Sequence, residues 1–198
     1  CSTKGRDDYD FHFTRGKASG VLTHGGSVAN LTALAAARAA IAPDAWTDGN
    51  PNDLVVIGAA SAHYSIARAL SILGLGKKAF YPVAVDENEV LLMEDLPRVY
   101  AKAMADGKRV MCVVANACAT STGLFDPIDA MGDFCQENNL WFHVDGAHGA
   151  AALAGPQSKQ YVKGIEKARS LIWDAHKMMR VPALCTAVLF RDFKDQAA

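Results

Sequence analysis

The stretch SLIWDAHKMMR, residues 170–180, ends an apolar run on charged and ionisable side chains. Asp174 follows Trp173 directly, and His176 and Lys177 come next. A lysine at such a position is either a surface residue at a strand end or a buried amine, and a desolvated amine can attack a carbonyl group. Because two methionines follow, we expect apolar packing that keeps Lys177 in a dry site.

A second strand-like run, LWFHVDGAHGA (residues 140–150), carries Asp145 near its end. His143 lies two positions earlier and so faces the same side of the strand. A buried carboxylate needs a partner, because burial without one is costly. That partner is a metal ion, with His143 and His148 as further ligands, or a protonated heterocyclic nitrogen. The spacing matches no conventional zinc motif; a structural aspartate that caps the next turn is the third alternative.

The segment THGGSVANLTAL (residues 23–34) places glycines between a strand-like run and a helix-like one. Glycine lets the backbone approach a ligand, and the first N–H groups of a helix attract a phosphate. Gly26 and Ser27 are therefore candidate phosphate ligands. The alternative is a simple turn in which Ser27 caps the helix.

Two further loops carry polar side chains. His63, in ASAHYSIARAL, stands between a strand-like and a helix-like run, where a flat imidazole could stack on a planar ligand or merely cap the helix. The small polar loop NACATSTGLFDP offers the hydroxyl group of Thr120 and its neighbours.

Short β-rich runs alternate with helix-like segments along the chain. Strands are predicted in GVLTHG, LVVIGAA, KAFYPVAV, VMCVVANA, LWFHVDGA, SLIWDA and LCTAVLFR, and helices in SVANLTALAAARAAIA, SIARALSILGLG, LMEDLPRVYAKAMADGK and DPIDAMGDFCQENN. The last helix is expected to begin at Asp126 with Pro127 at its first position. The alternation predicts an α/β fold with a mostly parallel, seven-stranded sheet covered on both faces.

The candidate residues gather at the carboxyl ends of five predicted strands, where ligands bind in such sheets. The segments concerned are residues 24–27, 60–63, 116–122, 145–148 and 174–177. This convergence predicts one ligand site built from separate strands.

Composition limits the other functions. The 198 residues are 51% hydrophobic and carry a formal net charge of -1, which gives no electrostatic case for nucleic acid or a membrane surface. No apolar run approaches the roughly 20 residues of a membrane helix. The five cysteines form no CxxC pair, so we expect reduced thiols in a cytoplasmic protein.

Together, a phosphate cradle, a stacking histidine, a buried aspartate and a strand-end lysine are the four attachments of pyridoxal 5'-phosphate. Asp145 would hold the pyridine nitrogen protonated, which makes the ring an electron sink. Lys177 would bind the cofactor covalently through its amine.

At these residues the chain resembles the group II pyridoxal-phosphate-dependent amino acid decarboxylases, from about Gly20 onward. The matching segments are GVLTHGGSVANLTALAAAR, AHYSIARALSILGLG, TGLFDPIDAM, LWFHVDGAHGA and WDAHKMMRVPALCTAVLFR. The resemblance implies the fold-type I (aspartate aminotransferase-like) architecture.

The resemblance also implies roles for individual residues. Lys177 matches the lysine that forms a Schiff base, Asp145 the pyridinium partner and His63 the ring-stacking histidine. Ala147 would pack on the opposite ring face, and Thr120 would lie near the cofactor hydroxyl and the substrate. The phosphate ligands would be Gly26, Ser27 and His176, with Asp174 beside the cofactor.

Several positions depart from the family pattern. Cys118 and Ala119 stand where Gly-Thr is common, so one hydroxyl is lost. Asp174 stands where asparagine is frequent, and a carboxylate that faces a phosphate is unfavourable unless it is turned away or protonated. His148 replaces a frequent aromatic or small residue.

The resemblance implies decarboxylation of an L-amino acid, with HKMM closer to the branch that acts on acidic amino acids such as glutamate, aspartate or cysteine sulfinate. Residues 1–198 would be the cofactor-binding large domain, cut at both ends, of a homodimeric protein that continues into a catalytic loop and a small C-terminal domain. Two alternatives remain: another fold-type I enzyme, such as an aminotransferase or a carbon–sulfur lyase, or a cofactor-binding fragment without catalysis.

Overall fold

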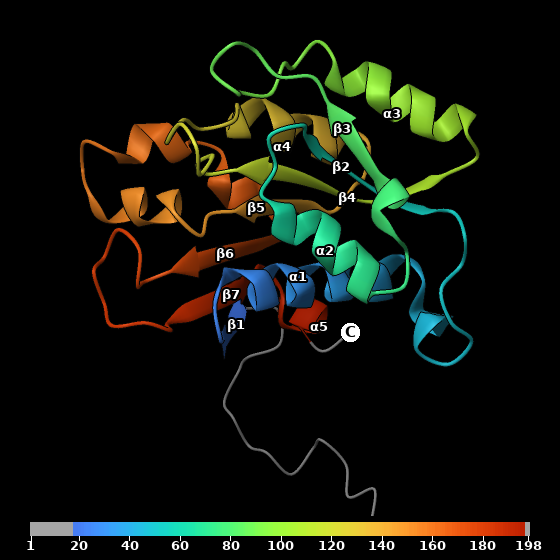
Figure 1. The fold of residues 1–198 in the computed structure, drawn as a ribbon, viewed down its shortest axis with the longest axis horizontal. Coiled ribbons are helices and arrows are strands. Elements are labelled where there is room, and N and C mark those ends of the chain that lie inside the picture. The colour runs from blue at the N-terminus through green and yellow to red at the C-terminus, as the bar shows by residue number, and fades with distance from the viewer. Residues whose placement is uncertain (1–17, 197–198) are drawn as a thin grey trace, which may run out of the picture.

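The computed structural model describes residues 18–196 as one α/β domain built on a seven-stranded sheet (Figure 1). The strands are β1 (Ser19–Thr23), β2 (Leu54–Ala59), β3 (Phe80–Val83), β4 (Arg109–Asn116), β5 (Phe142–Asp145), β6 (Ser170–Asp174) and β7 (Thr186–Phe190). The α-helices are α1 (Gly26–Ile41), α2 (Tyr64–Ile72), α3 (Leu96–Ala105), α4 (Ile128–Glu137) and α5 (Phe193–Gln196). Each of the seven predicted strands is therefore present.

The strand order is β1-β7-β6-β5-β4-β2-β3. Strands β2 to β6 pair in parallel, whereas β7 is antiparallel to both of its neighbours, β6 and β1. It follows that β1 runs in the same direction as the parallel strands. The carboxyl ends of β1, β2, β4, β5 and β6 thus meet at one edge, as the sequence predicts.

Helices cover the two faces of the sheet. The chain moves along the sheet in one direction through α1 and α2 and in the other through α3 and α4, and right-handed crossovers then place these two pairs on opposite faces. Figure 1 shows α1 and α2 together on one side and α3 and α4 on the other. Helix α1 packs on β4, β6 and β7, and its buried face is rich in alanine, which lets the backbones approach closely.

Burial is complete only in the middle of the sheet. Every residue of β2 and β5 is buried, and in β4 only the first is not. At the edge, β1 exposes three of its five residues, among them Leu22, which is 76% exposed. The prediction that both faces of the strands are covered is confirmed at the centre of the sheet. It is wrong for β1, an edge strand whose two faces are not both covered by helices.

Helix α4 begins later than the sequence predicts. Its first residue is Ile128, and Pro127 is the N-cap with a non-helical ψ of 67°. Asp126 is buried before the helix, where its carboxylate accepts the backbone N–H groups of Leu91 and Asn116. These two bonds hold Asp126 outside the helix.

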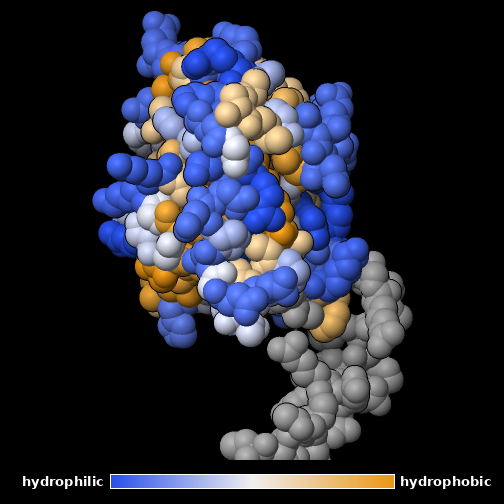
Figure 2. All heavy atoms as spheres, turned by 90° about the vertical axis from the view of Figure 1, so that its right-hand side faces the viewer, coloured by the Kyte–Doolittle hydropathy of each residue, from blue (hydrophilic) through white to orange (hydrophobic). Residues whose placement is uncertain are grey.

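Hydrophilic side chains predominate on the side of the molecule seen in Figure 2, with apolar ones scattered between them. Within residues 18–196, none of the helices combines the length and the apolar character needed to span a bilayer.

Candidate functional site

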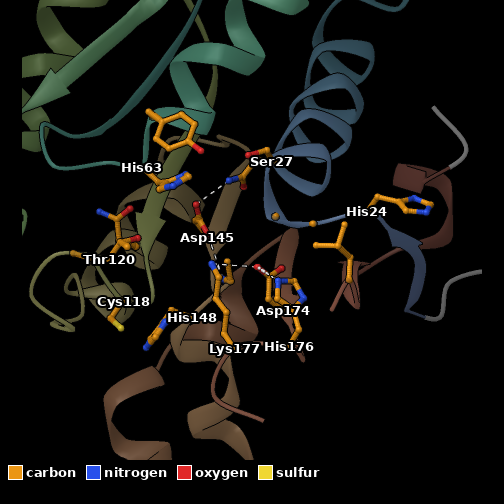
Figure 3. A pocket seen from close by; sticks show the side chains of 18 residues that line it. His24, Ser27, His63, Cys118, Thr120, Asp145, His148, Asp174, His176 and Lys177 are labelled. Atoms are coloured by element: carbon orange, nitrogen blue, oxygen red, sulfur yellow. Dashed lines mark hydrogen bonds and ion pairs between the residues drawn. The ribbon is translucent and has the colours of Figure 1, made fainter. Parts of the chain in front are cut away.

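One cavity of about 300 Å³ opens at the edge where the five strand ends meet. Its walls include every site residue predicted from the sequence, as Figure 3 shows for the labelled side chains. The predicted residues are Gly26, Ser27, His63, Thr120, Asp145, Ala147, Asp174, His176 and Lys177. The fold therefore brings together residues that are up to 151 positions apart, from Gly26 to Lys177.

The start of α1 forms one end of the cavity. Gly25 is the N-cap, with φ 91°, and it offers no side chain, so Ser27 is not the cap and its hydroxyl is left for other bonds. A Cβ on Gly26 would lie 3.1 Å from Asp174 Oδ2 and 3.4 Å from the Cβ of Ala147, so this close approach requires glycine. The free N–H groups of the first turn thus face a tightly packed corner that suits an anion.

Asp174 is buried in the same corner and is not turned away from it. Its Oδ2 lies 3.1 Å from Lys177 Nζ and 3.6 Å from His176 Nε2. Its Oδ1 is buried and has no hydrogen-bond partner within the described residues. His176 Nδ1 lies 3.1 Å from both the backbone nitrogen and the carbonyl oxygen of Cys185, so this nitrogen either accepts from the first or donates to the second.

Asp145, at the end of β5, is held by two neutral donors. Its Oδ2 accepts the side-chain amide of Asn30 at 2.8 Å, and its Oδ1 accepts the backbone N–H of Ala147 at 3.2 Å. Sequence reasoning missed Asn30, which is buried in the middle of α1 and also lines the cavity. A polar residue with low helix propensity inside an alanine-rich helix was the available signal.

His63 is the N-cap of α2, so the capping role is real. The backbone N–H of Ser65 donates to its Nδ1 at 3.3 Å, and the Ser65 hydroxyl lies 2.8 Å from the same nitrogen. Burial lowers the pKa of His63 more than the negative charge of Asp145 raises it. The ring nevertheless borders the cavity beside Asp145, which leaves it able to stack on a planar ligand (Figure 3).

The metal alternative for Asp145 finds no support within residues 18–196, where no group of three His, Cys, Asp or Glu side chains could hold an ion. His143 does face the same side as Asp145, but its two ring nitrogens already have partners. Nδ1 bonds to Ser170, and Nε2 bonds to Asn30. Burial lowers its pKa to about 4. His148 is exposed at the cavity rim.

Thr120 and Cys118 come from the loop after β4, and Thr120 is exposed where it borders the cavity. Cys118 is buried, and burial raises the pKa of its thiol.

The prediction that the two methionines after Lys177 pack around it and keep it in a dry site is wrong. Met178 is 53% and Met179 is 45% exposed, because the chain leaves the sheet after β6 and carries them to the surface.

The residues of the cavity fit pyridoxal 5'-phosphate. The first turn of α1 supplies N–H donors for a phosphate, His176 Nε2 faces the same corner, and Asp145 keeps carboxylate lone pairs that can accept a ring N–H. Lys177 Nζ reaches the same cavity from the segment after β6. The one discordant group is the Asp174 carboxylate, which occupies the phosphate corner.

Comparison with known proteins agrees with this arrangement. The family described as "Pyridoxal-dependent decarboxylase conserved domain" matches residues 8–197. The chain is 37% identical to the cysteine sulfinic acid decarboxylase of Mus musculus over 87% of its own length and 36% of that protein. It is 33% identical to the acidic amino acid decarboxylase GADL1 of the same organism, over 90% of this chain and 33% of that protein.

Solved structures agree as well. The apo form of mouse cysteine sulfinic acid decarboxylase superposes with a TM-score of 0.88 at 36% identity, over 91% of this chain and 38% of that one. The glutamate decarboxylase domain of a Vibrio parahaemolyticus protein gives a TM-score of 0.87 at 30% identity, over 90% and 40% of the two chains. The chain thus spans between a third and two-fifths of the length of these relatives. Since the family match runs through almost the whole chain and the cavity residues suit its cofactor, the chain belongs to the pyridoxal-dependent decarboxylase family, whose cofactor is pyridoxal 5'-phosphate.

Proposed function

We propose that this chain is the cofactor-binding large domain, residues 1–198, of an enzyme that decarboxylates an L-amino acid to an amine and CO2. The observation that carries the proposal is the meeting of Asp145 and Lys177 in one cavity, at the ends of the neighbouring parallel strands β5 and β6. A carboxylate and an amine that line one cavity can hold two ends of one planar cofactor.

Bound pyridoxal 5'-phosphate supplies a protonated ring that accepts the electron pair left when CO2 departs. Asp145 keeps a proton on the ring nitrogen, and the donors from Asn30 and Ala147 hold its carboxylate in place for that role. His63 would pack on one ring face and Ala147 on the other. Gly26, Ser27 and His176 would bind the phosphate, and Asp174 would adjoin it.

Lys177 would hold the cofactor covalently through Nζ and would yield that position to the amine of the substrate. Thr120, at the exposed side of the cavity, would orient the substrate next to the cofactor hydroxyl. Both groups act from segments that follow strand ends, β6 for Lys177 and β4 for Thr120.

The substrate is proposed to be acidic: glutamate, aspartate or cysteine sulfinate. Two relatives support this proposal by their names: a cysteine sulfinic acid decarboxylase, at 37% identity, and an acidic amino acid decarboxylase, at 33% identity. Because this chain spans about a third of each of them, the substrate side chain can be read by residues beyond the described cavity.

The enzyme is proposed to act as a homodimer in the cytoplasm. Exposed apolar side chains follow Lys177, namely Met178, Met179, Val181 and Leu184, and they suit a surface that a second copy covers. The described cysteines are free thiols, which suits a reducing compartment. Sedimentation of the protein and of its Val181→Glu variant tests the dimer, which the added charge should weaken.

The decisive assay offers the full-length protein glutamate, aspartate, cysteine sulfinate, lysine and tyrosine, and measures CO2 and keto acid separately. Release of CO2 from the acidic amino acids supports the proposal. Formation of keto acid without CO2 would instead support an aminotransferase, and cofactor binding without either product would support a non-catalytic domain.

A further inference from the structure

Asn30 stands at the centre of a buried hydrogen-bond network behind the cofactor cavity. Its Nδ2 lies 2.8 Å from both Asp145 Oδ2 and Ser65 Oγ, and its Oδ1 lies 2.9 Å from His143 Nε2. His143 Nδ1 lies 2.8 Å from Ser170 Oγ, which accepts the indole N–H of Trp141 at 2.8 Å. Each of these side chains is buried.

The donor sense of the network is fixed at the Asp145 end. The Trp141 indole can only donate, and the carboxylate oxygens of Asp145 accept from Asn30 and from the backbone N–H of Ala147. Working back from Asp145, the Asn30 amide nitrogen must face the carboxylate, so Asn30 Oδ1 accepts and His143 carries its proton on Nε2.

The contacts of Trp141 are compatible with the same direction. Ser170 accepts from the indole, so its own proton is free to point at His143 Nδ1. A neutral His143 with its proton on Nε2 accepts that bond at Nδ1 and donates from Nε2 to Asn30 Oδ1. Its lowered pKa, caused by burial, supports the neutral ring.

A branch extends from Asn30 to the stacking histidine. Ser65 Oγ accepts from the Asn30 amide, so its hydroxyl proton can point at His63 Nδ1. The Ser65 backbone N–H points at the same nitrogen. His63 Nδ1 is therefore an acceptor, and the proton of a neutral His63 is on Nε2.

We propose that Trp141, Ser170, His143 and Asn30 form a hydrogen-bond chain that ends on the Asp145 carboxylate and fixes two tautomers before the cofactor binds: His143 and, through Ser65, His63 both carry their proton on Nε2. The proposal rests on the proposed function, because its consequence is a site prepared for a protonated pyridine ring. Asn30 is a positioning residue, since it acts through Asp145 and Ser65.

The first test needs no cofactor. Long-range proton–nitrogen NMR spectra of the histidine-labelled protein distinguish the two neutral tautomers, and His63→Gln and His143→Gln variants assign the signals. We expect the Nε2–H form for His63 and for His143 near neutral pH. An Nδ1–H form at either ring overturns the chain.

Two tryptophan substitutions form a matched pair that tests whether Trp141 orients the hydrogen-bond chain. Trp141→Phe removes the fixed donor to Ser170, so an Nδ1–H population should appear at His143. Trp173→Phe removes an indole whose buried N–H has no partner among the described residues, so the His143 signal should stay unchanged. Equal spectra for the two variants contradict a directional role for Trp141.

The second test uses pyridoxal 5'-phosphate itself. Asn30→Asp keeps the shape of Asn30 but replaces the donor to Asp145 with an acceptor, and we expect the dissociation constant to rise about tenfold or more. Asn138→Asp makes the same change at the end of α4, where the amide donates to the Phe134 carbonyl, and should leave that constant unchanged. An unaltered constant in Asn30→Asp overturns the proposal. If the unsubstituted protein binds no cofactor at all, the proposed function fails, while the tautomer spectra still test the chain.

Discussion

Lys177 Nζ lies 3.1 Å from Asp174 Oδ2, and that oxygen in turn faces Gly26 at the start of α1. The carboxylate therefore lies where the cofactor phosphate is expected and pairs with the amine that is expected to bind the cofactor. Two anions in one corner repel each other, so Asp174 opposes phosphate binding as long as it is ionised.

Asp174→Asn should therefore bind pyridoxal 5'-phosphate and inorganic phosphate about tenfold more tightly, because the substitution removes the like charge and keeps the shape. Titration of each ligand, followed by absorbance or calorimetry, measures the effect. Asp192→Asn, at an exposed ion pair with Lys194, is the control and should change neither constant. Weaker phosphate binding by Asp174→Asn would mean that Asp174 donates a proton to the phosphate.

Gly26→Ala should weaken cofactor binding by about tenfold with little change in fold. The new Cβ would lie 3.1 Å from Asp174 Oδ2, so one of them must move into the phosphate corner. Thr32→Ala, on the exposed side of the same helix, controls for a change in helix stability. Equal cofactor affinity in Gly26→Ala and Thr32→Ala would exclude a phosphate cradle at this turn.

The buried His143 predicts a loss of stability in acid. Its folded pKa of about 4 lies below the ordinary value of 6.5, so between these values the unfolded chain binds more protons than the folded one. The free energy of unfolding contributed by His143 therefore falls as the pH drops from 6.5 to about 4, by up to about 3 kcal/mol. Above pH 6.5 this contribution is constant.

Asp126 acts in the opposite direction over the same range. Burial raises its pKa to about 6, so the folded state binds the extra proton and gains stability as the pH falls through 6. The difference between the unsubstituted protein and His143→Gln isolates the histidine. Urea unfolding of both at pH 7 and pH 4 should show a smaller loss in the variant, and parallel losses would contradict a neutral His143.

The sequence was sufficient to place the cavity because strand ends follow from local patterns. The apolar runs that end at Asp145 and at Asp174 are strands β5 and β6, and parallel strands bring their carboxyl ends to one edge. Glycines at the start of α1 and a histidine at the start of α2 complete the same edge.

What could not be predicted depends on packing between distant segments. Asn30 bonds to Asp145 across 115 positions, and that contact depends on how α1 crosses the sheet. Pro127 was expected inside α4, but tertiary hydrogen bonds to Asp126 keep the helix from starting there. The exposure of Met178 and Met179 depends on the path of the chain after β6, which apolar character alone does not set.

The most direct measurement of the central claim is the position of the covalent cofactor bond. Borohydride reduction of the full-length protein with pyridoxal 5'-phosphate fixes the cofactor to its lysine, and peptide mass spectrometry then identifies that residue. We predict a single modified lysine at Lys177, no modification in Lys177→Ala, and loss of CO2 release in the same variant. Modification at a different lysine, or CO2 release that persists in Lys177→Ala, would contradict the account.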